Sequence, residues 1–183
     1  MDNRSRFVLT TVWILISRAY DAYCTYQLTP DLTHEANPLV TVIGISSWSV
    51  LLCIIGVLTS YIIYAYYKSV FYPLNILPNE EGFTLSNMIA YTYLGRKDNW
   101  YAVFYKLPST FSWFTNYMGI VMTKGLVYAG IVSTIMWLLI RYTEFYPPLH
   151  NPALIYSILI IGCILIIYRW NRKIYHTYSS QFN

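Results

Sequence analysis

Residues 7–28 read FVLTTVWILISRAYDAYCTYQL, an apolar run that contains Arg18 and Asp21. A bilayer core of about 30 Å needs about 20 helical residues, so this stretch is long enough to cross it. A charged side chain at mid-bilayer costs at least about 2.5–3.5 kcal/mol, and such residues normally pair, face a cavity or serve function. The stretch therefore predicts a membrane helix whose charged residues mark the place to look for function.

Three further apolar runs are of similar or greater length, and the composition agrees with a membrane protein. Only 11% of the 183 residues are charged and 56% are hydrophobic, whereas an ordinary soluble domain has roughly 25% charged residues. We expect an all-α integral membrane protein with four transmembrane helices in a single domain, 1–183. The predicted spans are Phe7–Leu28, Leu39–Tyr67, Phe111–Ile140 and Leu149–Tyr168.

The basic residues predict how these spans are oriented. Nine of the 12 Lys and Arg residues lie before the first span, in the loop 68–110 or in the tail after Tyr168. The two short loops, 29–37 and 142–148, carry none. The positive-inside rule therefore places both termini and the long loop in the cytoplasm. We expect the protein in the cell inner (cytoplasmic) membrane.

The long loop is predicted to contain a short helix and an interfacial segment. Thr84 is a helix-capping residue, Leu85–Leu94 has an apolar face, and Gly95 is a helix stop. The segment Trp100–Tyr105 is rich in aromatic residues and lies between Lys97 and Lys106. We expect it in the cytoplasmic headgroup region; docking of a partner is the alternative.

An intramembrane polar cluster is predicted from helical spacing. Arg18, Asp21 and Thr25 share one helix face, because residues three and four apart are neighbours on a helix. Lys124 lies about as deep in the third span as Arg18 does in the first. Asp21 is therefore expected to pair with Lys124 or with Arg18. The cluster either neutralises its own charges and fixes helix register, or binds a proton, an ion or a head group.

A second polar cluster is predicted on the outer face, where the two short loops meet the membrane. Its members are Asp31, His34, Glu35, Asn37, Glu144 and His150. Carboxylates and imidazoles can bind a divalent metal, but the His and Cys residues lack the spacing of a known metal motif. No metal site, cofactor or catalytic residue is expected, because no phosphate-binding loop, nucleophile elbow or dinucleotide fingerprint is present.

Two parts of the chain resemble each other. The stretch from Trp13 to Asp21 is similar to that from Trp137 to Glu144, and each is followed by a His and an Asn-Pro step. The Asn-Pro steps, at Asn37 and Asn151, are helix-start signals. The similarity reflects chance, or else two helical hairpins in parallel arrangement with a shared site between them.

The pattern Asp21-x-x-x-Thr25 followed by Glu35-x-Asn37-Pro38 resembles the signature of a family of small, uncharacterised prokaryotic multi-pass membrane proteins. In that family a first helix carries Asp and Thr, and a Glu-x-Asn-Pro step opens the second. The resemblance covers about residues 10–60, and the later spans and the long loop depart from the family. It implies no activity, and it marks Asp21 and Glu35 for testing.

The sequence leaves three functions open. The first is a non-catalytic accessory or scaffold subunit of a larger membrane complex, because no catalytic motif and no soluble domain is evident. The second is a small transporter or channel in which the intramembrane cluster lines a polar path. The third is an intramembrane or lipid-modifying enzyme that uses the outer-face residues. The expected partners are the lipid bilayer and other membrane subunits or a second copy, and not nucleic acid.

Overall fold

The computed structural model describes residues 2–33, 35 and 37–182, and every regular element in that part of the chain is a helix. The four long helices are α1 (Asn3–Leu28), α3 (Trp48–Phe71), α5 (Phe111–Tyr142) and α6 (Pro152–Ser179). The short elements are α2 (Pro38–Thr41), α4 (Leu85–Leu94) and the 3-10 helices η1 (Trp100–Phe104) and η2 (Pro147–Leu149). The prediction of an all-α fold is confirmed.

Three of the long helices, α3, α5 and α6, are long and apolar enough to cross a membrane. Helix α1 has 26 residues, which corresponds to about 39 Å at 1.5 Å per residue. Its apolar sequence is interrupted by Arg18 and Asp21. The chain is therefore a helical protein of membrane type with three candidate spans, and α1 is a fourth long helix packed beside them.

The helix boundaries agree with the predicted spans at the third helix and differ at the second. The predicted continuous span from Leu39 is wrong, because α2 ends after one turn and α3 begins only at Trp48. Between them Gly44 has a φ of 81°, a left-handed conformation that glycine adopts freely and that ends a helix. Helix α6 begins at Pro152 and continues beyond Tyr168 to Ser179, so the basic tail is part of the last helix.

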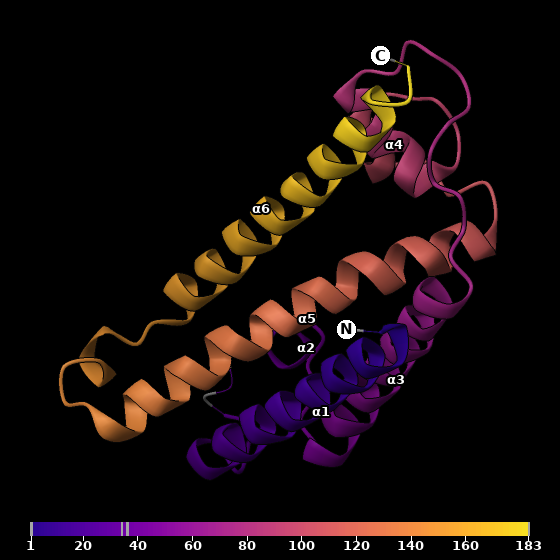
Figure 1. Cartoon of the computed structure of the whole chain (residues 1–183). Coiled ribbons are helices and arrows are strands. Elements are labelled where there is room, and N and C mark those ends of the chain that lie inside the picture. The colour runs from indigo at the N-terminus through magenta and orange to yellow at the C-terminus, as the bar shows by residue number, and fades with distance from the viewer. Residues whose placement is uncertain (1, 34, 36, 183) are drawn as a thin grey trace.

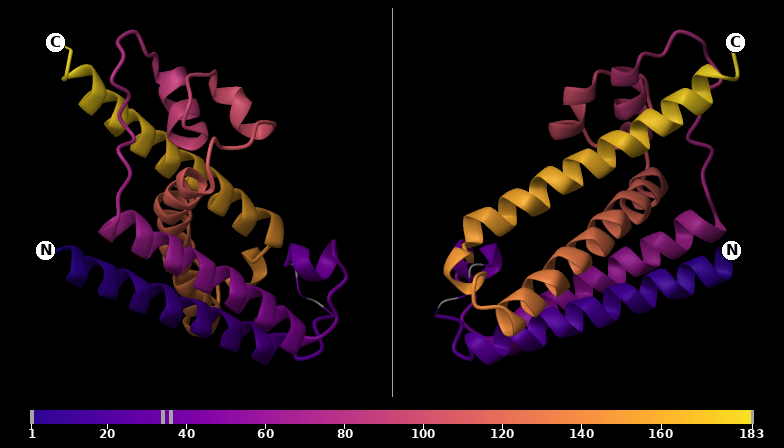
Figure 2. Two further views of the ribbon diagram at one scale, coloured as in Figure 1. Left: turned by 90° about the vertical axis from the view of Figure 1, so that its right-hand side faces the viewer. Right: turned by 60° about the vertical axis from the view of Figure 1, so that its left-hand side comes forward.

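Helix α5 is the central element of the bundle. It lies between α6 on one side and the pair α1 and α3 on the other (Figures 1 and 2). The start of α1, the end of α3, the start of α5 and the end of α6 lie toward one end of the molecule, here called the terminal end (Figure 1). The connections from α1 to α3 and from α5 to α6 lie at the opposite end, here called the hairpin end.

Small residues allow α5 to approach its neighbours closely. A Cβ built on Gly119 meets the backbone carbonyl of Ala65 on α3 well inside van der Waals contact. A Cβ built on Gly130 meets Ser17 of α1 in the same way. Close backbone approach at small residues is a common source of packing energy between membrane helices. Gly119 and Gly130 therefore set how near α5 lies to α3 and to α1.

The segment between α3 and α5 folds back onto the terminal end of α5 and α6. Thr84 caps α4 and Gly95 ends it with a φ of 74°, as predicted. The Thr92 hydroxyl donates a hydrogen bond to Oδ1 of the buried Asn171 on α6 (3.0 Å). Trp113 on α5 donates from its indole nitrogen to the Tyr91 carbonyl of α4 (3.1 Å). Polar contacts therefore join α4 to both of the helices that it covers.

We expect Gly119→Ala to destabilise the protein and Gly56→Ala to leave it as stable or more stable. The new methyl group at 119 has no room against Ala65, and overpacking of this kind costs about 1–3 kcal/mol. A Cβ at Gly56 of α3 meets nothing within 4 Å, so that substitution changes only helix propensity, which favours Ala. Thermal unfolding of both variants in mild detergent tests this, and an unchanged Gly119→Ala midpoint would contradict the close α3–α5 contact.

We expect the fold of the segment 96–106 to depend on pH through one ion pair. The Lys106 ammonium donates a hydrogen bond to Oδ2 of Asp98, and this bond lowers the pKa of the Asp98 carboxyl below its ordinary 3.8. A carboxyl with a lowered pKa stabilises the folded segment above pH 3.8, and this contribution is lost as the pH falls through the lowered value. Hydrogen exchange of these amides, corrected for intrinsic rates, should show protection that falls below pH 3.8 in the wild type. The Asp98→Asn variant should lack that step, and an identical profile in both proteins would refute the role of the pair.

Candidate functional site

Arg18 and Asp21 of α1 take part in a set of contacts that reach α5. The Asp21 carboxylate accepts from Nη1 of Arg18 (3.2 Å) and from Nε1 of Trp137 (2.8 Å). Nη2 of Arg18 donates to the Ser133 hydroxyl (2.8 Å). The side chains of Arg18 and Asp21 are only 21% and 30% exposed, so both charges are partly withdrawn from solvent. Of the two pairings predicted for Asp21, the structure contains the one with Arg18.

This charged group lines a cavity with a volume of about 730 Å³. All four long helices and both hairpin-end connections contribute to its wall, and it is partly open. The volume lies within the roughly 300–1,000 Å³ typical of small-molecule sites. Along α3 the lining runs from Trp48 to Ile62, about 21 Å at 1.5 Å per residue.

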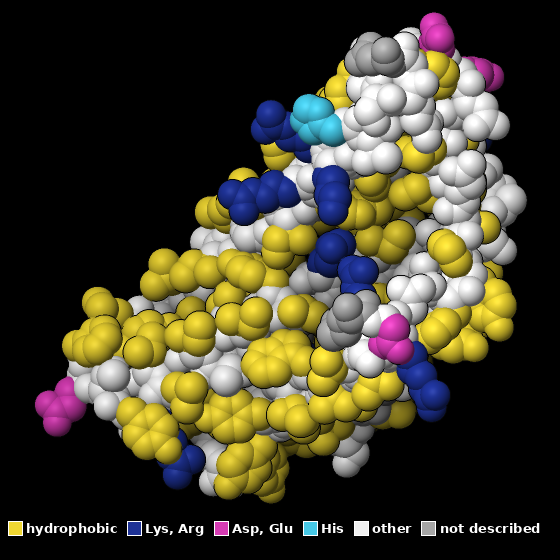
Figure 3. Space-filling model, viewed as in Figure 1, with side chains coloured by type: hydrophobic (Ala, Val, Ile, Leu, Met, Phe, Trp, Pro, Cys, Tyr) yellow, Lys and Arg dark blue, Asp and Glu magenta, His cyan; other side chains and the backbone are white. Residues whose placement is uncertain are grey.

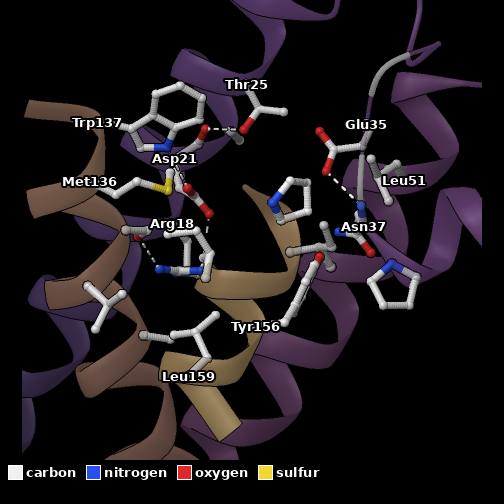
Figure 4. A pocket seen from close by; sticks show the side chains of 18 of the residues that line it. Arg18, Asp21, Thr25, Glu35, Asn37, Leu51, Met136, Trp137, Tyr156 and Leu159 are labelled. Carbon is white, nitrogen blue, oxygen red and sulfur yellow. Dashed lines mark hydrogen bonds and ion pairs between the residues drawn. The ribbon is translucent and has the colours of Figure 1, made fainter. Parts of the chain in front are cut away.

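The two parts of the cavity differ in chemistry. Polar side chains gather toward the hairpin end, where Glu35, Asn37 and His150 face the same space as Arg18 and Asp21. Figure 4 shows Glu35 and Asn37 across from Arg18 and Asp21, with the Tyr156 hydroxyl between the two groups. Deeper in the bundle the walls are mostly aliphatic, and the described residues there are Ile55, Leu58, Thr59, Ile62, Leu126, Ala129, Val132 and Leu159. The cavity thus has a polar end and an apolar end.

Six of the ten predicted site residues line this cavity. They come from both predicted clusters and are Arg18, Asp21, Thr25, Glu35, Asn37 and His150. The sequence pattern assigned three of them to the membrane and three to the outer face, and the fold brings these two groups to one cavity. Thr25 donates its hydroxyl hydrogen to the backbone oxygen of Asp21 (2.8 Å), so it does not bind the carboxylate itself.

The two residues of the Glu-x-Asn-Pro step have local structural roles as well. The Asn37 side chain caps α2 by accepting from the backbone N–H of Leu39 (3.0 Å). The Glu35 carboxylate accepts from the backbone N–H of Asn37 (2.9 Å). The same contact therefore shapes the connection to α3 and holds a carboxylate on the cavity lining.

The other four predicted site residues lie elsewhere or cannot be placed. The Asp31 carboxylate accepts from Thr33 within its own loop (3.1 Å and 2.8 Å). Glu144 is exposed in the connection from α5 to α6, and His34 lies outside the described residues. Lys124 does not line the cavity. It precedes Ser133 by nine residues on α5, about 13 Å nearer the terminal end, so Lys124 and Arg18 are not at the same depth.

Sequence reasoning missed two polar side chains of the site, Trp137 and Tyr156. Trp137 was noticed only as part of the possible repeat, yet its indole N–H binds Asp21. Tyr156 lies one turn after the Asn-Pro start of α6 and lines the same cavity as Glu35 and Asp21. Position after a helix-start signal would have been the clue to Tyr156. Nothing in the local sequence connects Trp137 with Asp21.

The arrangement favours recognition of a ligand by hydrogen bonding. Carboxylate, imidazole, amide and phenol groups share the polar end. Nε of Arg18 and Nδ1 of His150 are buried and have no hydrogen-bond partner among the described residues. Buried polar atoms are normally satisfied, so a ligand with polar groups fits here. No group of three or more His, Cys, Asp and Glu residues able to hold a metal occurs within the described ranges.

We expect Asp21→Asn to destabilise the protein more than removal of both charges. Breaking a fully buried ion pair costs about 3–5 kcal/mol, and partial exposure of this pair reduces the expected cost to about 1–2 kcal/mol. The double variant Arg18→Met, Asp21→Leu leaves no unpaired charge, so its thermal midpoint should lie above that of Asp21→Asn. Glu144→Gln, which removes an exposed carboxylate, is the control and should behave as wild type. Equal midpoints for Asp21→Asn and Glu144→Gln would show that the pair does not matter for stability.

Comparison with known proteins gives no relative from which to read a function. No family model, no curated protein and no solved structure matches this chain. The similarity to the prokaryotic family with the Asp-x-x-x-Thr and Glu-x-Asn-Pro signature stays a prediction. The function is therefore inferred from the chemistry of the cavity.

Proposed function

We propose that this protein crosses the cytoplasmic membrane four times, with α1 as the fourth span and both termini in the cytoplasm. Four contacts join α1 to α5: Trp13 with Val127, Ser17 with Gly130, Arg18 with Ser133, and Asp21 with Trp137. The contact positions increase together, so α1 and α5 run in the same direction, as the first and third spans of such a protein must. Partial burial of Arg18 and Asp21 against α5 lowers the cost of placing that helix in lipid.

We propose further that the protein binds a lipid-like amphiphile in the cavity between its helices. The observation that carries this proposal is that both polar clusters line one end of a cavity whose other end is aliphatic. An amphiphile has the same division, with a polar head group and a hydrocarbon tail. In the proposed topology the polar end lies near the outer surface of the membrane and the apolar end lies within it, as for a lipid of the outer leaflet.

The polar end offers complementary groups to a head group. Glu35, Asn37 and Tyr156 supply acceptors and donors, and His150 presents a ring nitrogen that has no partner among the described residues. The Arg18–Asp21 pair is internally neutral, so it adds hydrogen-bonding capacity without a large net charge. A head group rich in hydroxyl or amide groups suits this mixture better than a bare ion does.

Among the three functions predicted from sequence, this proposal favours a transporter or an enzyme acting on lipids. A transporter is expected to have a continuous polar cavity that reaches Asp21, and an enzyme is expected to bring His34, Glu35 and His150 within a few ångströms of each other. The cavity is lined by Asp21, Glu35 and His150, although it is polar at one end only, and His34 lies outside the described residues. The accessory-subunit function, which needs no such cavity, stays a prediction, and the exposed aromatic side chains of η1 are the feature that would serve it.

We expect Ala22→Trp to abolish most amphiphile binding and Ala19→Trp to leave it unchanged. Ala22 lines the cavity, so an indole there occupies the space of the ligand, whereas Ala19 is exposed on the same helix. The expected loss is about tenfold or more, which corresponds to about 1.4 kcal/mol of binding free energy. The measurement is mass spectrometry of lipids that remain bound to the full chain purified in mild detergent.

The outcome that contradicts the proposal is equal lipid content in the two variants. Wild-type protein free of any bound amphiphile, after reconstitution in native lipid extract, would contradict it as well. Thermal unfolding of both variants separates loss of binding from loss of fold.

A further inference from the structure

The 3-10 helix η1 and the residues that follow it form a patch of exposed apolar side chains, here called the apolar patch. Each of its members is at least 49% exposed, and they are Trp100, Tyr101, Phe104, Tyr105 and Leu107. Scattered apolar residues are normal on a protein surface, but a contiguous exposed group marks contact with another molecule or with a membrane.

Contacts with α4 hold η1 in one place. Ala102 is fully buried and packs with Ala90 and Leu94 of α4. The backbone N–H of Trp100 donates to the Ser86 hydroxyl of α4 (3.1 Å). One face of η1 is therefore fixed on α4, and the apolar patch is presented by a folded segment.

Ring contacts place α4 beside the first two turns of α5. Tyr91 of α4 packs edge-on against Trp113 of α5, with ring centroids 5.5 Å apart. Tyr93 of α4 contacts Tyr117 of α5 in the same way (5.1 Å). Trp and Tyr gather at the two membrane–water interfaces of membrane proteins. This part of α5, and with it α4 and η1, therefore has the composition of a membrane boundary.

Basic residues indicate the same boundary. Lys and Arg side chains form a band across the face shown in Figure 3, and the surface on its hairpin side is mainly hydrophobic. Next to η1, Arg96 and Lys97 are exposed, and neither takes part in an ion pair with another described residue. The nearby carboxylate of Asp98 is already paired with Lys106. The surroundings of the patch are thus positive, which suits anionic lipid head groups.

We propose that the apolar patch inserts into the lipid leaflet at the terminal end, so that α4 and η1 form an interfacial anchor beside the membrane helices. In the proposed topology this is the cytoplasmic leaflet. A short amphipathic element that lies in the interface buries its apolar face at the boundary between head groups and acyl chains.

The patch combines the two kinds of side chain that such a position needs. Trp100 and Phe104 contact each other, with ring centroids 5.9 Å apart, and offer hydrocarbon surface. Tyr101 stacks on Tyr105 (6.4 Å), and the Tyr101 hydroxyl accepts from the side-chain nitrogen of Asn99 (2.9 Å). A tyrosine has an apolar ring and a polar tip, which suits the level of the head groups.

Continuity with α5 favours lipid over a partner protein as the occupant of the patch. Leu107 is 81% exposed, and Phe111, the first residue of α5, is 72% exposed. Four residue steps separate them, at most about 14 Å of extended chain. The patch therefore joins directly onto a helix that is long and apolar enough to cross a membrane.

This anchor is independent of the cavity. Among the described residues, none of the segment 77–110 lines the cavity. Failure of one proposal therefore leaves the other standing.

The test is photo-crosslinking of the full chain in the membranes of the cells that produce it, with benzoylphenylalanine in place of Phe104 or of Leu107. These two side chains are 77% and 81% exposed, so the probe does not disturb the packing of η1 on α4. The expected product is an adduct with a phospholipid, detected as a mass increase of the purified protein. Glu81, an exposed acidic residue of the same segment, is the matched control position and should give no lipid adduct.

A second substitution tests the contribution of Phe104 itself, with the probe kept at Leu107. Phe104→Glu should lower the yield of lipid adduct about tenfold, because the transfer free energy of one aromatic side chain is lost. Phe104→Leu should keep the yield, because the side chain stays apolar.

Two results overturn the proposal. Adducts with a second protein in place of lipid would make the patch a docking surface for a partner. Adducts with neither lipid nor protein at both patch positions would show that the patch faces water.

Discussion

The need to neutralise Asp21 inside an apolar bundle organises the whole molecule. A lone carboxylate among aliphatic side chains would be costly, and here Arg18 and Trp137 both donate to it. Because one donor comes from α1 and the other from α5, satisfying this charge also holds the two helices together in one register. Ser133 completes the arrangement by accepting from Arg18. The α1–α5 contact in turn forms part of the cavity wall, so the same interaction that neutralises Asp21 also shapes the cavity.

Helix α5 divides the molecule chemically as well as spatially. Glycines 119 and 130 bring it close to α3 and α1, while α6 lies on its other side (Figure 2). Residues of both α3 and α6 line the cavity. One face of α5 therefore lines the cavity, and Lys124 lies on a different face of the same helix.

Local sequence signals predicted the local structure well. Asn37 and Asn151 cap helices with Pro at the next position, and Thr84 and Gly95 bound α4; each signal depends only on hydrogen bonds and backbone geometry within a few residues. The second span was predicted too long because hydropathy does not detect a break in a chain that stays apolar. Residues 39–47 are mostly apolar or small, and only the left-handed Gly44 reveals that the helix ends there.

By itself the sequence determined the helical class, the membrane-type composition and the list of polar residues worth testing, because length and hydrophobicity act residue by residue. Only the tertiary structure decided which of these residues meet. Glu35 and His150 are distant from Asp21 in sequence. They share its cavity because α3 and α6 both begin at the end of the bundle where α1 ends. Lys124, which hydropathy had placed beside Arg18, lies nearer the terminal end, because α5 is longer than a bilayer requires and is displaced along its axis relative to α1. The depth of a residue in a bundle depends on how the helices are offset along their axes, and the sequence of one helix does not determine that offset.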